Sequence, residues 1–62
     1  MDAWMADKII QMRENRITQV DISRKSGKTR EAVNRILNGK VTKASSREWV
    51  TKAIDEIIAE RS

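Results

Sequence analysis

The chain has 62 residues, of which 39% are hydrophobic and 35% charged, and its formal net charge is +4. A chain of about 60 residues allows one domain with one small core, because it buries only about 60% of the surface that it exposes when unfolded. It contains no cysteine and no histidine, which excludes disulfides, a conventional zinc site and the usual acid–base catalyst. No apolar run approaches the ~20 residues of a membrane span, and there is no signal-peptide pattern. We therefore expect residues 1–62 to form one cytoplasmic domain that binds no membrane, metal, cofactor or small-molecule ligand.

The basic residues are concentrated in the middle of the chain. Positions 13–47 hold ten basic residues and only three acidic ones, which gives this stretch a charge of +7. The segments on either side are weakly acidic. A central basic block is typical of a surface that binds a polyanion. The alternative is an ordinary solvated surface, and the overlap of the block with the helix pair described below favours the polyanion.

The composition predicts an all-α fold, because the chain has no proline and is rich in Lys, Arg, Glu, Ala and Ile. We expect a compact bundle of four helices that contains a helix-turn-helix, with the helices at about 3–14, 19–26, 30–38 and 46–61. In the first helix, Asp2 is placed as the cap, and Met5, Ile9 and Met12 share one apolar stripe.

The second helix, 19–26, has clear signals at both ends. Thr18 is the expected N-cap, and Asp21 follows three residues later in a capping-box arrangement. Ile22 is its main inward residue, and Gly27 is placed to end it, because a left-handed backbone costs glycine little.

The third helix, 30–38, is expected to begin after Thr29 and to direct Val33, Ile36 and Leu37 inward. Only two residues separate Gly27 from this helix. The two helices must therefore meet at a steep angle, which is the geometry of a helix-turn-helix and not of an antiparallel hairpin.

The last helix, 46–61, is expected to begin after Ser45, with Glu48 completing a capping box. Its apolar stripe is the clearest in the chain and consists of Trp49, Val50, Ala53, Ile54, Ile57 and Ile58. The stripe is wider than a core of this size needs. Two interpretations stay open: Ile57, Ile58 and Trp4 close the core of the monomer, or they are shared with a second subunit.

Several short motifs fall in register across positions 17–57. They are VDIS (20–23), SG (26–27), AVNRILNGK (32–40) and SSREWVTKAIDEI (45–57). With Gln19 and Ile22, they resemble the lambda-repressor-like DNA-binding domains, which include Cro-type and Xre-type regulators, and most closely the lactose-repressor-type headpiece. Lys28 departs from the pattern, which has an apolar residue there, and helix 3–14 is foreign to that headpiece but ordinary in Cro and Xre domains. The resemblance implies DNA binding by a helix-turn-helix without small-molecule induction.

The polar side of helix 30–38 supplies the candidate base-reading residues. Arginine pairs with guanine O6 and N7, a carboxylate accepts from the cytosine amino group, and asparagine suits adenine. The expected base contacts are Arg30, Glu31, Asn34 and Arg35. The resemblance matches Arg30, Glu31 and Arg35 to base-reading positions, and Thr29, Asn34 and Asn38 to contacts with the DNA backbone.

Further phosphate contacts are expected around this helix. Thr18 and Gln19 stand at the start of helix 19–26, where free N–H groups and the helix dipole favour an anion. The flanking lysines Lys28, Lys40 and Lys43 are the other expected phosphate contacts.

These observations predict a sequence-specific, double-stranded DNA-binding transcriptional regulator of phage or mobile-element type. One helix-turn-helix of this size makes few contacts, so we expect a homodimer on a pseudo-palindromic operator.

The alternative is a protein-interaction module, of antitoxin or anti-repressor kind, that keeps the helix-turn-helix scaffold. An enzyme is the least favoured class, because no nucleophile stands beside a base and no metal ligands cluster. The charge also permits RNA binding, but the chain has no Phe or Tyr on which bases would stack.

Overall fold

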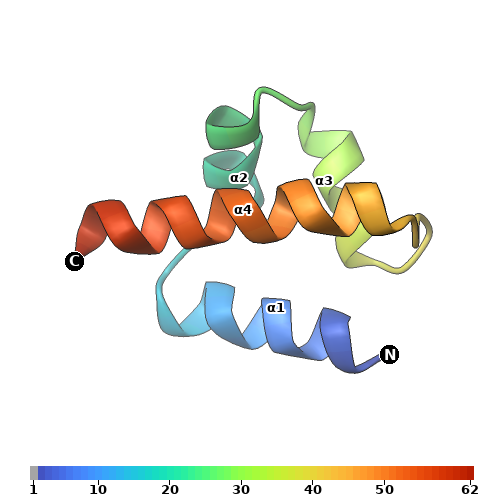
Figure 1. Cartoon of the computed structure of the whole chain (residues 1–62), viewed down its shortest axis with the longest axis horizontal. Helices are drawn as coiled ribbons and strands as arrows, with labels where there is room; N and C mark the ends of the chain where they lie inside the picture. The colour runs from blue at the N-terminus through green and yellow to red at the C-terminus, as the bar shows by residue number, and fades with distance from the viewer. Residues whose placement is uncertain (1) are drawn as a thin grey trace.

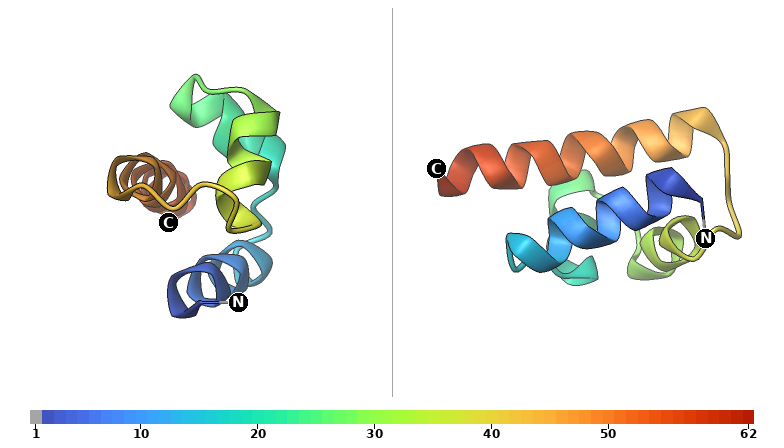
Figure 2. Two further views of the ribbon diagram at one scale, coloured as in Figure 1. Left: turned by 90° about the vertical axis from the view of Figure 1, so that its right-hand side faces the viewer. Right: turned by 90° about the horizontal axis from the view of Figure 1, so that it is seen from below.

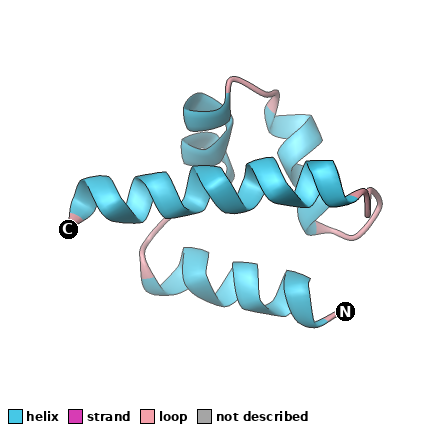
Figure 3. Ribbon diagram, viewed as in Figure 1, coloured by secondary structure: helices cyan, strands magenta, loops and turns pink. Residues whose placement is uncertain are grey.

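The computed structural model describes residues 2–62, and all of their regular structure is helical (Figure 3). The four helices are α1 (Ala3–Glu14), α2 (Gln19–Ser26), α3 (Arg30–Leu37) and α4 (Ala44–Arg61) (Figure 1). The prediction of an all-α bundle of four helices is confirmed. No helix within residues 2–62 is long and apolar enough to cross a membrane.

The long helix α4 is the support on which the short helices are arranged. In Figure 1 it runs across the middle of the molecule, with α2 and α3 on one side and α1 on the other. The end-on view in Figure 2 shows α2 and α3 side by side, with α4 and α1 set apart from each other. α2 packs on both α4 and α3, and α3 also contacts α1 and α4. The three helices α2, α3 and α4 thus form the centre of the fold, and α1 joins them mainly through α3.

Side-chain caps fix the starts of the first three helices, as predicted. The Met5 amide donates to Asp2 Oδ1 over 2.9 Å, and the Ala32 amide donates to Thr29 Oγ1 over 3.1 Å. At α2 the capping box is complete: the Asp21 amide donates to Thr18 Oγ1, and the Thr18 amide donates to Asp21 Oδ2. Each cap satisfies an amide that has no partner inside the helix.

Two predicted helix ends are wrong. α4 begins at Ala44 and not at 46, and its N-cap is Lys43, whose side chain makes no capping bond. The Arg47 amide already donates to the Lys43 carbonyl, so the first turn closes before Ser45 can act as the cap. α3 ends at Leu37, one residue early, and Asn38 is its C-cap.

The core lies between α2, α3 and α4. Its buried members are Ile17, Ile22, Val33, Ile36, Leu37, Val50, Ala53, Ile54 and Ile57. Ile57 belongs to this cluster, and Trp4 and Ile58 pack against it. Of the two interpretations of the wide α4 stripe, closure of the monomer core therefore accounts for these three residues.

The predicted apolar stripe of α1 is partly wrong. Met5 is buried and Met12 packs against the core, but the buried residue between them is Lys8 and not Ile9. The Lys8 side chain covers apolar surface with its stem, and its ammonium donates to Gln11 Oε1 on the same helix over 3.1 Å. Lys8 therefore takes the inward position predicted for Ile9, while Met5 and Met12 keep theirs, and the neighbouring Ile10 remains 52% exposed.

Two glycines adopt the left-handed backbone that the chain needs at the ends of α2 and α3. Gly27 has φ +74° and its amide donates to the Ser23 carbonyl. Gly39 has φ +78°, and a Cβ there would stand 2.9 Å from Met5 Sδ. A Cβ at Gly27 would have no heavy atom within 4 Å. Both positions disfavour a side chain, but only Gly39 is also enclosed by α1.

This difference predicts unequal costs for two matched substitutions. Gly27→Ala introduces only the strain of a left-handed residue, and we expect it to lower the free energy of unfolding by about 1 kcal/mol. Gly39→Ala also displaces the flexible end of the Met5 side chain, and we expect a somewhat larger loss of about 1–2 kcal/mol. Urea unfolding followed by circular dichroism measures both. Equal losses would show that α1 does not press on Gly39.

Candidate functional site

The exposed side of α3 carries every residue that was predicted to read bases. Arg30, Glu31, Asn34 and Arg35 are all exposed. The opposite side of the same helix is closed, since Val33, Ile36 and Leu37 are at most 4% exposed. The eight-residue helix therefore divides cleanly into a core side and a polar side.

The two charged residues at the middle of this polar side form an ion pair. Arg35 Nη2 lies 2.6 Å from Glu31 Oε1, one helical turn away. Their side chains are 59% and 72% exposed. An exposed pair at this spacing contributes only about 0.3–0.5 kcal/mol, so it orients the two groups without holding them tightly.

A row of side-chain amides links α2 to the polar side of α3. Asn34 Nδ2 donates to Gln19 Oε1 over 3.3 Å, and Asn38 Nδ2 donates to Asn34 Oδ1 over 2.8 Å. The structure thus brings together three of the predicted contact residues from two helices. The row sets the orientation of the Asn34 amide, because each of its ends has one partner.

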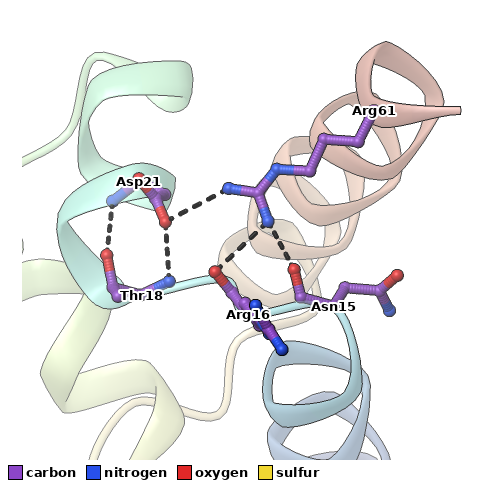
Figure 4. Close-up of polar contacts among 5 residues, drawn as sticks. All are labelled: Asn15, Arg16, Thr18, Asp21 and Arg61. Carbon is purple, nitrogen blue, oxygen red and sulfur yellow. Dashed lines mark hydrogen bonds and ion pairs between the residues drawn. The ribbon is translucent and has the colours of Figure 1, made fainter.

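The start of α2 and the linker before it are tied to the C-terminal end of α4 by Arg61, the last residue of α4 (Figure 4). Arg61 Nη1 donates to the carbonyls of Asn15 and Arg16, in the linker before α2. Its Nη2 lies 3.6 Å from Asp21 Oδ2, in the capping box of Thr18. Arg16, which has φ 55°, is the one non-glycine residue with a positive φ within residues 2–62. Arg61 therefore holds a strained linker and the first turn of α2 in one place.

This contact also affects the acidity of Asp21. The pKa of the Asp21 carboxyl is lowered from 3.8, first by the backbone N–H of Thr18 and then by the Thr18 side chain, with a smaller contribution from Arg61. The pKa of Asp2 is lowered in the same direction, first by the Met5 amide and then by Arg47. In both cases the ionised carboxylate is the form that the folded chain binds.

The turn between α2 and α3 is closed by side chains of α2. Ser23 Oγ donates to the Lys28 carbonyl over 2.5 Å, and the Lys28 amide donates to Ser26 Oγ over 3.2 Å. Both serines therefore help to fix the backbone that leads into α3. The Lys28 ammonium lies 5.9 Å from the centre of the Trp49 ring on α4, which is near the limit for a cation–π contact. The Lys28 side chain thus extends toward α4.

The remaining predicted phosphate contacts border α3 at both ends. Thr29 caps its start, and the Lys40 amide donates to the Arg35 carbonyl at its end, over 2.9 Å. Lys43 stands at the start of α4. All three are exposed, but no contact among the described residues joins Lys43 to the polar side chains of α3.

Many basic residues of the central block remain unpaired. Within residues 2–62, three of the ten form ion pairs, namely Lys25 with Glu60, Arg35 with Glu31, and Arg47 with Asp2. The other seven are exposed and have no acidic partner in the described chain: Arg13, Arg16, Arg24, Lys28, Arg30, Lys40 and Lys43. Arg13, Arg16 and Arg24 were not among the predicted site residues, although their excess over the acids was visible in the sequence.

A separate hollow of about 510 Å³ lies on the outer side of α4, next to the start of α1. Trp4 and Arg47 line it, and the Arg47 guanidinium lies 4.8 Å from the centre of the Trp4 ring. Arg47 also pairs with Asp2 over 2.5 Å. No group of three or more His, Cys, Asp or Glu residues among the described positions is arranged to hold a metal ion.

The Asp21 capping box predicts an acid-sensitive start of α2, and the Arg61 contacts predict that this start is anchored to α4. Because the pKa of Asp21 is lowered in the folded chain, its contribution to stability is complete above its ordinary value of 3.8 and is lost as the pH falls below that value. We expect Arg61→Ala to lower the free energy of unfolding by about 1 kcal/mol near neutral pH, mostly through the lost bonds to Asn15 and Arg16. We expect Asp21→Asn to flatten the loss of stability below pH 4. Thermal unfolding of both variants against pH measures this, with Lys52→Ala as the exposed control on α4. An Arg61→Ala variant as stable as the control would contradict the anchor.

Comparison with known protein families, curated proteins and solved structures finds no match to this chain.

Proposed function

We propose that the protein is a sequence-specific, double-stranded DNA-binding transcriptional regulator that places α3 in the major groove. The observation that carries this proposal is the exposed polar side of α3, with two arginines, a glutamate and one asparagine opposite a closed apolar side. Helix side chains of these types recognise base edges in the major groove. The seven exposed, unpaired basic residues of the central block support it, because phosphates dominate the affinity of such complexes.

In this proposal α2, the turn at Gly27 and α3 act as a helix-turn-helix. The short connection between the two helices and their mutual packing support it. The resemblance to lambda-repressor-like domains remains part of the proposal, with α1 as the additional helix that Cro-type and Xre-type domains have. Such a protein is a regulator of phage or mobile-element type, acting in the cytoplasm.

The proposed contacts divide by chemistry. Arg30 and Arg35 pair with guanine O6 and N7, Glu31 accepts from a cytosine amino group, and Asn34 bonds to adenine or to a phosphate. The first turn of α2 binds a phosphate through its free amides, near Thr18 and Gln19. Thr29 and Asn38 border the groove, and Lys28, Lys40 and Lys43 add phosphate contacts around it.

A homodimer on a pseudo-palindromic operator is part of the same proposal. One small domain buries too little DNA surface for tight specific binding, and two copies on half-sites about 34 Å apart remedy this. Ile57 lies in the monomer core and Ile58 packs against it, so these two residues contribute little free apolar surface. We therefore propose that pairing is assisted by DNA.

The alternative function is a protein-interaction module on the same scaffold. The hollow beside Trp4 and Arg47 is the observation that favours it, because an aromatic ring lines it among polar and charged side chains and it lies outside α3. A chain of this kind would bind no duplex in preference to another.

Selection of bound duplexes from a random pool tests the proposed function directly. We expect one enriched half-site that includes guanine, repeated in inverted orientation with centres about one helical turn apart. Sedimentation of the chain with and without the selected duplex gives the stoichiometry, for which we expect two copies on DNA. Enrichment of no sequence would reject the regulator and favour the interaction module.

Alanine substitutions separate base readers from phosphate contacts. We expect Arg30→Ala and Arg35→Ala each to cost about 1–3 kcal/mol at the selected site and to relax the preference at one base position. Lys40→Ala should weaken binding to all duplexes alike and reduce the salt slope by about one unit. Titrations at several salt concentrations measure both effects. If both arginine variants keep the wild-type base preference, α3 is not the recognition helix.

A further inference from the structure

Glu31 occupies an unusual place on α3. At about 100° per residue around an α-helix, it lies almost opposite Val33 and far from Ile36 and Leu37. It is 72% exposed, and it is the only acidic residue between positions 22 and 47. The outermost position of the candidate recognition helix therefore carries a negative charge within a strongly basic stretch. A carboxylate at this place opposes general binding to a polyanion.

The same carboxylate already has a partner in the free protein. Its Oε1 lies 2.6 Å from Arg35 Nη2, so the arginine is held along the helix and turned toward Glu31. The pair is largely exposed and therefore weak, and little binding energy is needed to separate it. A partner that satisfies both groups at once can replace it, whereas a phosphate can satisfy only Arg35 and leaves Glu31 facing a like charge.

A guanine–cytosine step in the major groove supplies such a partner. Guanine offers two acceptors, O6 and N7, to Arg35, and cytosine offers an amino group to Glu31. We propose that Glu31 and Arg35 form a coupled reader, in which Glu31 restrains Arg35 from binding phosphates and admits it only to a guanine that has a cytosine amino group within reach of Glu31. This inference rests on the proposed DNA-binding function and assigns to Glu31 a role in discrimination rather than in affinity.

The test compares Glu31→Gln with Glu48→Gln. Both changes remove one negative charge from an exposed glutamate in an early turn of a helix, and Glu48 lies on α4 away from α3. We expect Glu31→Gln to strengthen binding to a duplex of unrelated sequence by on the order of tenfold. It should also lower the ratio of specific to non-specific affinity and broaden the base preference at the cytosine position. Glu48→Gln should change the affinity for either duplex by about twofold or less, because the charge of Glu48 is remote from the DNA and screened.

A double substitution tests the coupling itself. If Glu31 acts by restraining Arg35, then Glu31→Gln strengthens non-specific binding far less in an Arg35→Ala background than in the wild type. Equal strengthening in both backgrounds would overturn the coupled reader and leave Glu31 as a simple repelling charge. Thermal unfolding of each variant confirms that α3 is folded, which the exposure of both side chains makes us expect.

The outcomes separate this inference from the function on which it rests. If the wild-type chain prefers no duplex, both the proposed function and the coupled reader are wrong. A wild-type chain with a clear half-site, together with a Glu31→Gln variant that behaves as Glu48→Gln does, overturns the coupled reader alone. Broadened preference and strengthened non-specific binding, both reduced in the Arg35→Ala background, support it.

Discussion

The burial of three apolar side chains on one side of α3 is the constraint on which the rest of the molecule depends. Val33, Ile36 and Leu37 fill the space between α2 and α4 and leave at most 4% of their surface exposed. Because α3 has only eight residues, its rotation about its own axis is fixed by these three contacts. Turning the helix by one residue would bury a charged group such as Arg35 and expose a core residue, and both changes are costly. The apolar side therefore sets the rotation of α3. The exposed polar residues of α3 are not needed for that rotation and are available to bind a ligand.

The polar bonds of the surface act on a finer scale than the core. The bonds of Arg61 to the linker, of Ser23 to the turn, and of Asn34 to Gln19 fix where the ends of α2 and α3 lie. These groups are partly or largely exposed, and each such bond contributes only about 1 kcal/mol or less to the free energy of unfolding. Their consequence is positional: the start of α2 and the exposed side of α3 are held at a fixed spacing before any ligand arrives. A preformed surface loses less conformational entropy on binding than a mobile one.

The parts of the fold that were predictable from the sequence are those decided by neighbouring residues. The caps at Asp2, Thr18 and Thr29 and the inward side of α3 follow from spacings of three or four residues, and all were predicted correctly. The wrong predictions concern features that depend on packing between distant parts of the chain. Lys8 is buried because its aliphatic stem is covered by the fold while its ammonium stays bonded to Gln11, and nothing in the local sequence marks this lysine as different from the others.

The candidate site also combines features that the sequence predicts with features that it does not. The exposure of the predicted base readers could be read from the helical period, and so could the spacing of Glu31 and Arg35. The bond between Gln19 and Asn34, 15 residues apart, and the contacts of Arg61 across 45 and 46 residues have no signal in the sequence. The position of the Lys28 side chain over Trp49 is also a product of packing, since the two belong to separate elements. Sequence reasoning thus names the participants on each helix but not the connections between helices.

The two open surfaces of the molecule face different ways, which bears on how its proposed activities relate. The buried residues of α3 point toward α4, and those of α4 point toward α2 and α3. The exposed sides of these two helices must therefore point away from each other. A duplex that covers the polar side of α3 would leave the hollow beside Trp4 and Arg47 accessible to a second molecule. The proposed DNA contact and the hollow thus lie on different surfaces of this fold, and the two proposals do not require the same residues.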